Sequence, residues 1–323
     1  MNIQFHLTNA CNLRCKHCYQ GEYDREIISL SDFLLILDKT KKFFDLIGDP
    51  IYSLALTGGE PLTVPAFDKY FLLANSHCKK LTLMTNGLLL TPERLENLKK
   101  ATNFFKVQVS LEGPEKINDA IRGIGTYKKI RTAIKYVNEA HIRSAVSFTI
   151  APYNYDKIVE LYDDLLRYDP PNFIWFDRCI PFKGTGTITK EQFQYFLISV
   201  QELFKRQTAE NLPVKIVANR ALQWLIGKEA GKPYTCGAGF RHFTIMHNGD
   251  VMICRRLNFS IGNLLEEDWS QIIKKAVPIL KEIHRLPDEC QTCQHAKACN
   301  GGLKCLTYAL YKDFNKKDIN CLL

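Results

Sequence analysis

Residues 11–18, in a loop with the spacing C-x3-C-x2-C, read Cys11-Asn12-Leu13-Arg14-Cys15-Lys16-His17-Cys18. Cysteine thiolates hold iron-sulfur clusters, and three of them can ligate three irons of a cubane. The fourth iron then stays open to the amine and carboxylate of a ligand. A zinc loop or three unrelated thiols remain alternatives, because thiolate softness does not separate zinc from iron-sulfur. The loop alone therefore predicts a metal site of undecided type.

The loop follows the first of six predicted strands, which alternate with amphipathic segments up to about residue 180. This alternation is typical of βα units around a parallel sheet, so the sequence predicts an α/β fold, a partial (β/α)6 barrel. Ligands of such sheets bind beyond the carboxyl ends of the strands, and each barrel motif below directly follows a strand. The predicted strands are residues 3–7, 52–56, 80–85, 105–110, 144–149 and 172–178.

Helical patterns begin near residues 31, 65, 92, 126 and 155. Ser31 before Asp32 and Thr91 before Pro92 have the residue types of helix N-caps. Residues 188–232 read as polar helices without a motif, and cysteines, glycines and short runs follow from residue 233. We therefore expect three parts: a barrel (1–187), a helical bridge (188–232) and a small metal-stapled domain (233–323).

The chain has 323 residues, twelve cysteines and a formal charge of +9. No apolar run approaches the ~20 residues that span a bilayer, and residues 1–7 are too short for a signal peptide, so we expect a cytoplasmic protein. Cytoplasmic thiols stay reduced, so clustered cysteines indicate metal and not disulfides. The positive charge favours anionic partners but selects none. Because the lysines are spread along the helices, we expect no nucleic acid and no membrane as partner.

Two further motifs follow predicted strands. The second strand ends in Thr57-Gly58-Gly59-Glu60-Pro61. Glycines let the backbone approach a ligand, and Glu60 can accept a hydrogen bond from an ammonium group, although paired glycines also mark ordinary turns. The fourth strand ends in Ser110-Leu111-Glu112-Gly113, and further on come Ile121-Arg122-Gly123 and Gly125-Thr126-Tyr127.

These motifs resemble those of the radical S-adenosylmethionine (SAM) superfamily: the GGEP motif, and the S-L-D-G-P…R-G-x-G-T-F stretch of its peptide-modifying branch. Glu112 replaces the usual Asp. The resemblance implies a SAM-binding [4Fe-4S] cluster on Cys11, Cys15 and Cys18. It also implies that His17 lies along the adenine, that Gly58, Gly59 and Glu60 face the methionine amino group, and that Ser110 and Arg122 bind the ribose hydroxyls and the carboxylate. Arg122 as a surface ion-pair residue is the alternative.

Seven cysteines gather in the last third of the chain. Twelve residues separate Cys236 from Gly249, and four more precede Cys254. The others follow as Cys290-x2-Cys293-x5-Cys299-x5-Cys305 and, after a gap, Cys321. A zinc-stapled mini-domain is one interpretation, since four-cysteine zinc sites fold small domains outright.

The same spacing resembles the SPASM domain, except that five residues precede Cys305 where that pattern has three. The resemblance implies two auxiliary [4Fe-4S] clusters, which makes three clusters in all. Cys290, Cys293, Cys299 and Cys321 would hold the outer one, and Cys236, Cys254 and Cys305 the inner one. The inner cluster is one ligand short, so either Cys179, at the end of the sixth predicted strand, completes it or the site stays open. We expect an open site.

The resemblance covers essentially the whole chain and implies reductive cleavage of SAM to a 5'-deoxyadenosyl radical that takes a hydrogen atom from the substrate. The SPASM tail implies a maturase that forms a carbon-carbon, carbon-oxygen or thioether crosslink in a ribosomally made peptide. The implied partners are a precursor peptide with its leader and a reductant such as flavodoxin or ferredoxin. Either a separate leader-binding protein or the barrel mouth would recruit the peptide.

Three alternatives remain. The first is an anaerobic sulfatase maturase, but that group has an acidic residue directly after the position of Cys254. Arg255 and Arg256 stand here instead and suggest a basic surface for an acidic peptide or carboxylate, or else solvated arginines. The second is a peptide epimerase with Cys179 as hydrogen-atom donor. The third is a zinc-bound interaction protein that keeps the barrel as a scaffold. Cys179 and Arg255 are thus our candidate catalytic residues.

Overall fold

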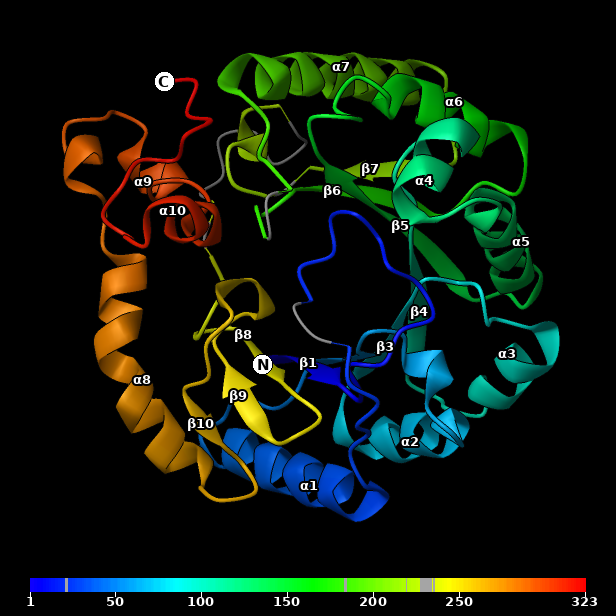
Figure 1. The fold of residues 1–323 in the computed structure, drawn as a ribbon, viewed down its shortest axis with the longest axis vertical. Coiled ribbons are helices and arrows are strands. Elements are labelled where there is room, and N and C mark those ends of the chain that lie inside the picture. Colours follow the sequence, from blue (N-terminus) through cyan, green and yellow to red (C-terminus); the bar gives the residue numbers. More distant parts are fainter. Residues whose placement is uncertain (21–22, 183–184, 219, 227–233, 235) are drawn as a thin grey trace.

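The structure is a computed structural model that describes residues 1–20, 23–182, 185–218, 220–226, 234 and 236–323. Figure 1 shows its strands inside a ring of helices, with the carboxyl end of the chain on the side of α9 and α10. The strands are β1 (Asn2–His6), β2 (Ser53–Thr57), β3 (Lys80–Thr85), β4 (Phe104–Ser110), β5 (Arg143–Ile150), β6 (Phe173–Arg178), β7 (Lys215–Val217), β8 (His242–Ile245), β9 (Asp250–Met252) and β10 (Gly262–Asn263). The helices are α1 (Leu30–Leu46), α2 (Phe67–Ala74), α3 (Pro92–Leu98), α4 (Glu115–Arg122), α5 (Thr126–Glu139), α6 (Ile158–Arg167), α7 (Lys190–Ala209), α8 (Trp269–His284), α9 (Ala296–Cys299) and α10 (Lys304–Tyr311).

The ten strands form one mixed sheet in the order β10-β9-β8-β1-β2-β3-β4-β5-β6-β7. Neighbouring strands from β8 through β1 to β7 are parallel, and β9 and β10 run antiparallel. Strand β1 therefore lies inside the sheet, between β2 and β8. Because β1 to β6 are parallel, their carboxyl ends open on the same side, where a ligand of such a sheet binds.

All six predicted strands are present, each within one residue of its predicted ends, and β3 matches its predicted range. Four short strands, β7 to β10, extend the sheet beyond the prediction. Strand β7 lies within residues 188–232, so the range predicted as a helical bridge holds α7 but is not purely helical. Strand β8, in the expected C-terminal domain, pairs with β1. Strands of three and four residues are too short to give a periodic hydrophobic signal.

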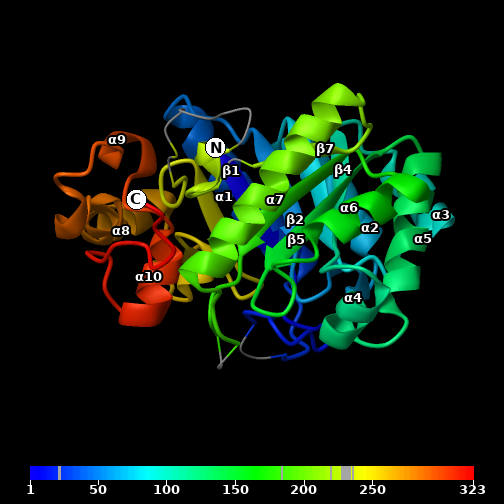
Figure 2. The same cartoon turned by 90° about the horizontal axis from the view of Figure 1, so that it is seen from above.

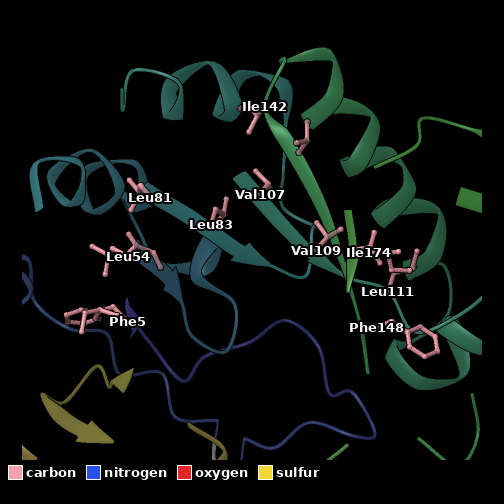
Figure 3. Packing of buried hydrophobic residues seen from close by; sticks show 14 of the residues in the cluster. Phe5, Leu54, Leu81, Leu83, Val107, Val109, Leu111, Ile142, Phe148 and Ile174 are labelled. Carbon is pink, nitrogen blue, oxygen red and sulfur yellow. The ribbon is translucent and has the colours of Figure 1, made fainter. Parts of the chain in front are cut away.

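The main core lies between the sheet and the surrounding helices. Figure 3 shows its side chains, among them Phe5, Leu54 and Phe148, which are fully buried. Successive side chains along a strand point to opposite faces. Gln4 and His6 of β1 therefore point away from the helices, into the interior of the barrel, where Gln4 reaches Met84 of β3.

Two predicted N-caps have different outcomes. Thr91 caps α3, because its side chain accepts a hydrogen bond from the Arg94 amide at 3.2 Å, as predicted. Ser31 is not the cap of α1. The helix begins at Leu30, and its N-cap is Ser29. The Ser29 hydroxyl accepts a hydrogen bond from the Asp32 amide, three residues further on, at 3.1 Å.

Helix α8 joins the C-terminal part of the chain to the barrel through one buried indole. Trp269 packs against Phe44 and Phe243, with ring centroids 5.0 and 5.1 Å away. Its Nε1 donates to the Thr40 hydroxyl of α1 at 3.0 Å, and the residue is 1% exposed. Aromatic rings of α1, β8 and α8 thus share one core, so the two parts of the chain are packed together.

In the part of the chain that the structure describes, no helix combines the length and the apolar character that a membrane span requires.

The indole contact gives a stability prediction. Trp269→Ala removes a fully buried aromatic side chain and leaves a cavity between α1 and α8, so we expect the free energy of unfolding to fall by about 3–5 kcal/mol. Urea unfolding followed by circular dichroism measures it. Leu46→Ala is the matched control, because Leu46 of α1 is 83% exposed and its loss should change little. Equal effects of the two substitutions would contradict the shared core.

Candidate functional site

The loop after β1 carries the first three cysteines and lies over one end of the strands (Figures 1 and 2). The Gly59 amide donates to the Thr8 carbonyl oxygen, and the Glu60 amide to that of Ala10, each at 2.8 Å. A Cβ on Gly58 would lie 2.5 Å from the Thr8 oxygen, and one on Gly59 would come closer still to that of Ala10. The two glycines therefore let the end of strand β2 approach the segment that leads into Cys11. The sequence predicts such a close approach toward a ligand, and the structure shows one toward the chain's own backbone.

The three thiols of this loop lie within electrostatic range of one another. Cys11 interacts with both Cys15 and Cys18, and the Cys18 amide donates to the Cys15 carbonyl at 3.1 Å. Burial raises the pKa of Cys11 to about 11, and it raises that of Cys15 against the opposing charge of Arg122. A bound metal deprotonates its thiol ligands outright, so gathered, partly buried sulfur donors fit a cluster.

Glu60 is fully buried, and donors of the same chain occupy most of the hydrogen-bonding capacity of its carboxylate. Oε1 accepts hydrogen bonds from the Thr85 hydroxyl at 2.7 Å and the Leu62 amide at 3.1 Å, and Oε2 accepts one from the Asn86 amide at 2.7 Å. Burial raises its pKa, although these donors oppose the effect. Because a carboxylate offers about four lone-pair directions, roughly one remains for an ammonium group.

Glu112, which replaces the usual Asp of the motif, is a centre of contacts in the structure. It is 1% exposed, and its Oε1 accepts Nη2 of Arg122 at 2.7 Å and lies 3.3 Å from Nε2 of His17. Oε2 accepts the Thr149 amide at 2.8 Å. Burial alone would raise its pKa, but His17 and Arg122 outweigh burial and hold the pKa at about 2. Glu112 thus joins two predicted SAM contacts, and the buried Arg122 is not a surface ion-pair residue.

Some polar atoms near these groups have no partner. Ser110 ends β4, opposite Ser147 of β5, and its hydroxyl makes no hydrogen bond with any residue that the structure describes. Among the same residues, Nδ1 of the His17 ring is buried without a partner. These atoms and the remaining direction at Glu60 are therefore available to a ligand.

A cavity of about 370 Å³ lies in the C-terminal part of the chain. Four of its lining residues are the cysteines predicted for the outer cluster, Cys290, Cys293, Cys299 and Cys321. Burial raises the pKa of Cys299 to about 11. Four sulfur donors around one space fit a four-iron cluster, and by their chemistry alone they would also fit zinc.

The remaining three C-terminal cysteines form a second group. Cys305 interacts electrostatically with Cys254 and Cys236, and burial raises its pKa to about 12. Cys254 is likewise within range of Cys236. The phenol of Tyr234 interacts with Cys236 and Cys305, so it belongs to the same surroundings. This group has three sulfur donors, as the sequence predicts for the inner cluster.

Cys179 is the alternative fourth ligand that the sequence offers for the inner cluster. It directly follows β6, it is 2% exposed, and its Sγ lies 3.6 Å from the Ile180 carbonyl oxygen. Burial raises its pKa to about 11, and the charged groups acting on it are Glu112 and Arg256. It also interacts with Tyr153, which Glu112 affects as well. Cys179 thus shares Glu112 with the barrel interior and Arg256 with the inner cysteines.

The end of β6 carries a buried ion pair that the sequence analysis missed. Arg178 donates to both carboxylate oxygens of Asp318 at 2.7 Å and to Oδ1 of Asn320 at 2.8 Å. Both charged side chains are at most 2% exposed, and Asp318 lines the outer cysteine cavity. The pair therefore ties the barrel to the segment that carries Cys321. A charged residue at the end of an apolar strand was the available signal.

A second ion pair at this strand end involves the inner cysteines. Asp177 accepts from Arg256, and Arg220 Nε lies 3.4 Å from the same carboxylate oxygen. Burial opposes ionisation of Asp177, but the charge of Arg256 outweighs it and lowers the pKa. The charge of Arg256 also acts on Cys254 and Cys305. Arg256 is thus paired, and the description of this arginine as solvated is wrong.

The side chain of Arg255 has other partners than that of Arg256. It begins a short 3-10 helix, Arg255–Leu257, and only 6% of the residue is exposed. Its guanidinium carbon lies 5.2 Å from the centroid of the Tyr19 ring, and Nη1 donates to Oδ1 of Asn258 at 3.1 Å. Tyr19 directly follows Cys18, so Arg255 lies beside the first cysteine loop and is not solvated either.

Two family models match the chain. The Radical SAM superfamily model matches residues 5–165, and the SPASM model, described as an iron-sulfur cluster-binding domain, matches residues 236–294. The matches cover more than half of the chain. They fall on the barrel motifs and on the first C-terminal cysteines, so the domains that they identify bind SAM and iron-sulfur clusters.

The chain is similar to curated proteins along most of its length. It is 27% identical over 269 residues to the sporulation killing factor maturation protein SkfB of Bacillus subtilis (strain 168), covering 82% of this chain and 63% of SkfB. The chain thus spans less than two thirds of that relative. It is 26% identical to the AdoMet-dependent heme synthase of Methanosarcina barkeri (strain Fusaro / DSM 804), covering 99% of this chain and 95% of the synthase.

Solved structures share the fold. Streptococcus suis SuiB, crystallised with its precursor peptide SuiA, superposes with a TM-score of 0.78 at 18% identity, covering all of this chain and 76% of SuiB. Because both family models fall on residues that the fold brings to the strand ends and the C-terminal cysteine groups, the chain is an enzyme that belongs to the radical SAM superfamily and carries a SPASM domain.

Proposed function

We propose that this enzyme is a maturase that uses SAM to modify a ribosomally made peptide. The observation that carries the proposal is that one fold combines three separate cysteine groups, the first of them in a loop at the strand ends that also carry the SAM-binding motifs. The similarity to SkfB, which is named as a maturation protein, supports a peptide as the substrate. The type of bond that forms is left open among carbon-carbon, carbon-oxygen and thioether crosslinks.

In this proposal the first loop holds the SAM-binding cluster, through Cys11, Cys15 and Cys18. When bound, the cluster and SAM supply one-electron cleavage of the sulfonium and removal of a hydrogen atom from the substrate. The chain's own residues orient SAM. The remaining direction at Glu60 accepts the ammonium group, the Ser110 hydroxyl binds the ribose, and Glu112 fixes His17 and Arg122 in place.

The C-terminal cysteines would hold two further clusters, which would supply a site for the electron that remains on the product. The four cysteines of the 370 Å³ cavity complete the outer site. The inner site has three cysteines and stays open in this proposal, because Cys179 is not among the groups that chiefly act on Cys254 and Cys305. A reductant such as flavodoxin or ferredoxin supplies the first electron.

The proposed cluster count predicts iron content. Anaerobic reconstitution of the wild type should give about twelve irons per chain, and dithionite with SAM should release 5'-deoxyadenosine. Cys15→Ala should lose about four irons and all cleavage. Cys78→Ala is the matched control, because Cys78 is a buried cysteine outside the three groups. Zinc without iron in the wild type, or cleavage that survives in Cys15→Ala, would defeat the proposal.

The length match with the heme synthase favours a second candidate, a reaction on a tetrapyrrole, because the chain spans 95% of that relative and 63% of SkfB. Peptides encoded beside the gene and an iron porphyrin should be offered in turn to the loaded enzyme. For a maturase we expect SAM-dependent loss of hydrogen from a peptide, measured by mass spectrometry, and an unchanged porphyrin. SAM-dependent conversion of the porphyrin alone would favour the second candidate.

Glu112→Gln should weaken both the fold and SAM binding, because it leaves Arg122 buried without a counter-charge. Near neutral pH we expect a loss of about 3–5 kcal/mol in the free energy of unfolding, measured with urea, and a higher KM for SAM. The pKa of Glu112 is held at about 2, against about 4.3 in an unfolded chain. Its stabilisation is therefore complete above about pH 5 and is lost as the pH falls toward 2.

Glu112→Asp is the control for this substitution, because it keeps the charge and has the residue usual in the family motif. It should retain more of the stability and of the affinity for SAM than Glu112→Gln. If the two variants were equally impaired, shape and not charge would explain the role of Glu112.

A further inference from the structure

The two arginines after Cys254 meet opposite electrostatic surroundings. Arg256 contacts the Asp177 carboxylate, and its charge acts on Cys254 and Cys305. Arg255 contacts the side-chain amide oxygen of Asn258 and the ring of Tyr19. Among the residues that the structure describes, no carboxylate lies within ion-pair distance of Arg255, and its buried Nε has no hydrogen-bond partner.

His6 and Tyr19, the two other groups on which the charge of Arg255 acts, supply no carboxylate to pair with it. His6 of β1 is 1% exposed, and neither of its ring nitrogens has a partner among the described residues. Burial, and then the charge of Arg255, hold the pKa of His6 well below its usual value, so His6 is neutral. A guanidinium without an ion-pair partner and an imidazole without a hydrogen-bond partner are thus buried within electrostatic range of each other.

A buried cation without a partner is costly, so an anion must complete this arrangement. An inner cluster is one source of negative charge, but Arg256 already acts on its cysteines. A ligand that enters the barrel is the other source. The planar fork of a guanidinium matches a carboxylate, and a bidentate pair gives orientation as well as affinity.

We propose that Arg255 binds a carboxylate of the substrate inside the barrel, which makes an acidic or C-terminal residue the recognised part of the peptide. This inference rests on the proposed peptide maturase. The neighbouring residue Tyr19 directly follows the first cysteine loop, so a carboxylate on Arg255 would hold the peptide next to the SAM site. His6, within electrostatic range of Arg255, offers a further ring nitrogen without a partner among the described residues. Arg255 would then set both the position and the charge of the substrate.

The first experiment asks what Arg255 does without substrate. In Arg255→Met, an apolar side chain of similar length replaces the unpaired charge, so the cluster-loaded protein should melt a few degrees higher with unchanged iron content. Arg241→Met is the matched control, because Arg241 is an exposed arginine close to β8, and its melting temperature should not change. A lower melting temperature with loss of iron from Arg255→Met would overturn the inference, since the arginine would then support the inner cluster.

The second experiment tests carboxylate recognition with three probes, Ac-Gly-Asp-Gly-NH2, Ac-Gly-Asn-Gly-NH2 and Ac-Gly-Asn-Gly-OH. Calorimetry with the cluster-loaded, SAM-bound protein should show at least tenfold tighter binding of one acidic probe than of the neutral amide. The preference should vanish in Arg255→Met and persist in Arg241→Met. The first probe reports a side-chain carboxylate and the third a C-terminal one. Equal binding of all three, or binding of none, would overturn the inference.

Deoxyadenosine measured in the same preparations separates this inference from the proposed function. A wild type that does not cleave SAM defeats the proposed function whatever the probes do. A wild type that cleaves SAM but does not distinguish acidic from neutral probes defeats only the role of Arg255.

Discussion

Two backbone hydrogen bonds, from Gly59 to Thr8 and from Glu60 to Ala10, hold the first cysteine loop against the end of β2. They form because Gly58 and Gly59 have no Cβ, which would otherwise meet the carbonyl oxygens of the loop. The contact fixes where the loop crosses the strand ends. His17 consequently lies at Glu112, and the three thiols come together above the sheet.

Charge is buried at this end of the barrel, and it is paired almost everywhere. Glu112 faces Arg122, Arg178 faces Asp318, and both pairs are nearly excluded from solvent. Removal of one member of a buried ion pair leaves the other charge buried without compensation, which is strongly destabilising. The intact pair adds little net stability, because desolvation offsets its attraction, so its main effect is to fix geometry. Arg255 has no such counter-charge among the described residues, and an unpaired buried charge is the kind of group that a ligand completes.

The C-terminal part of the chain is integrated with the barrel. Strand β8 pairs with β1, and Trp269 packs into the core formed by α1 and β8. The Arg178–Asp318 pair adds a third connection near Cys321. Because all three contacts join buried surfaces, the cysteine groups keep fixed positions relative to the barrel mouth, as electron transfer between bound clusters would require.

The sequence by itself determined six parallel strands, the grouping of the cysteines and the family, because hydrophobic periodicity and ligand spacing are local properties. It could not determine that β8 closes onto β1 or that α8 enters the core, since these contacts join residues more than two hundred positions apart. Nor could it distinguish Arg255 from Arg256. Adjacent in sequence, they differ only in what the fold places before them, a carboxylate for Arg256 and the Tyr19 ring with the Asn258 amide for Arg255.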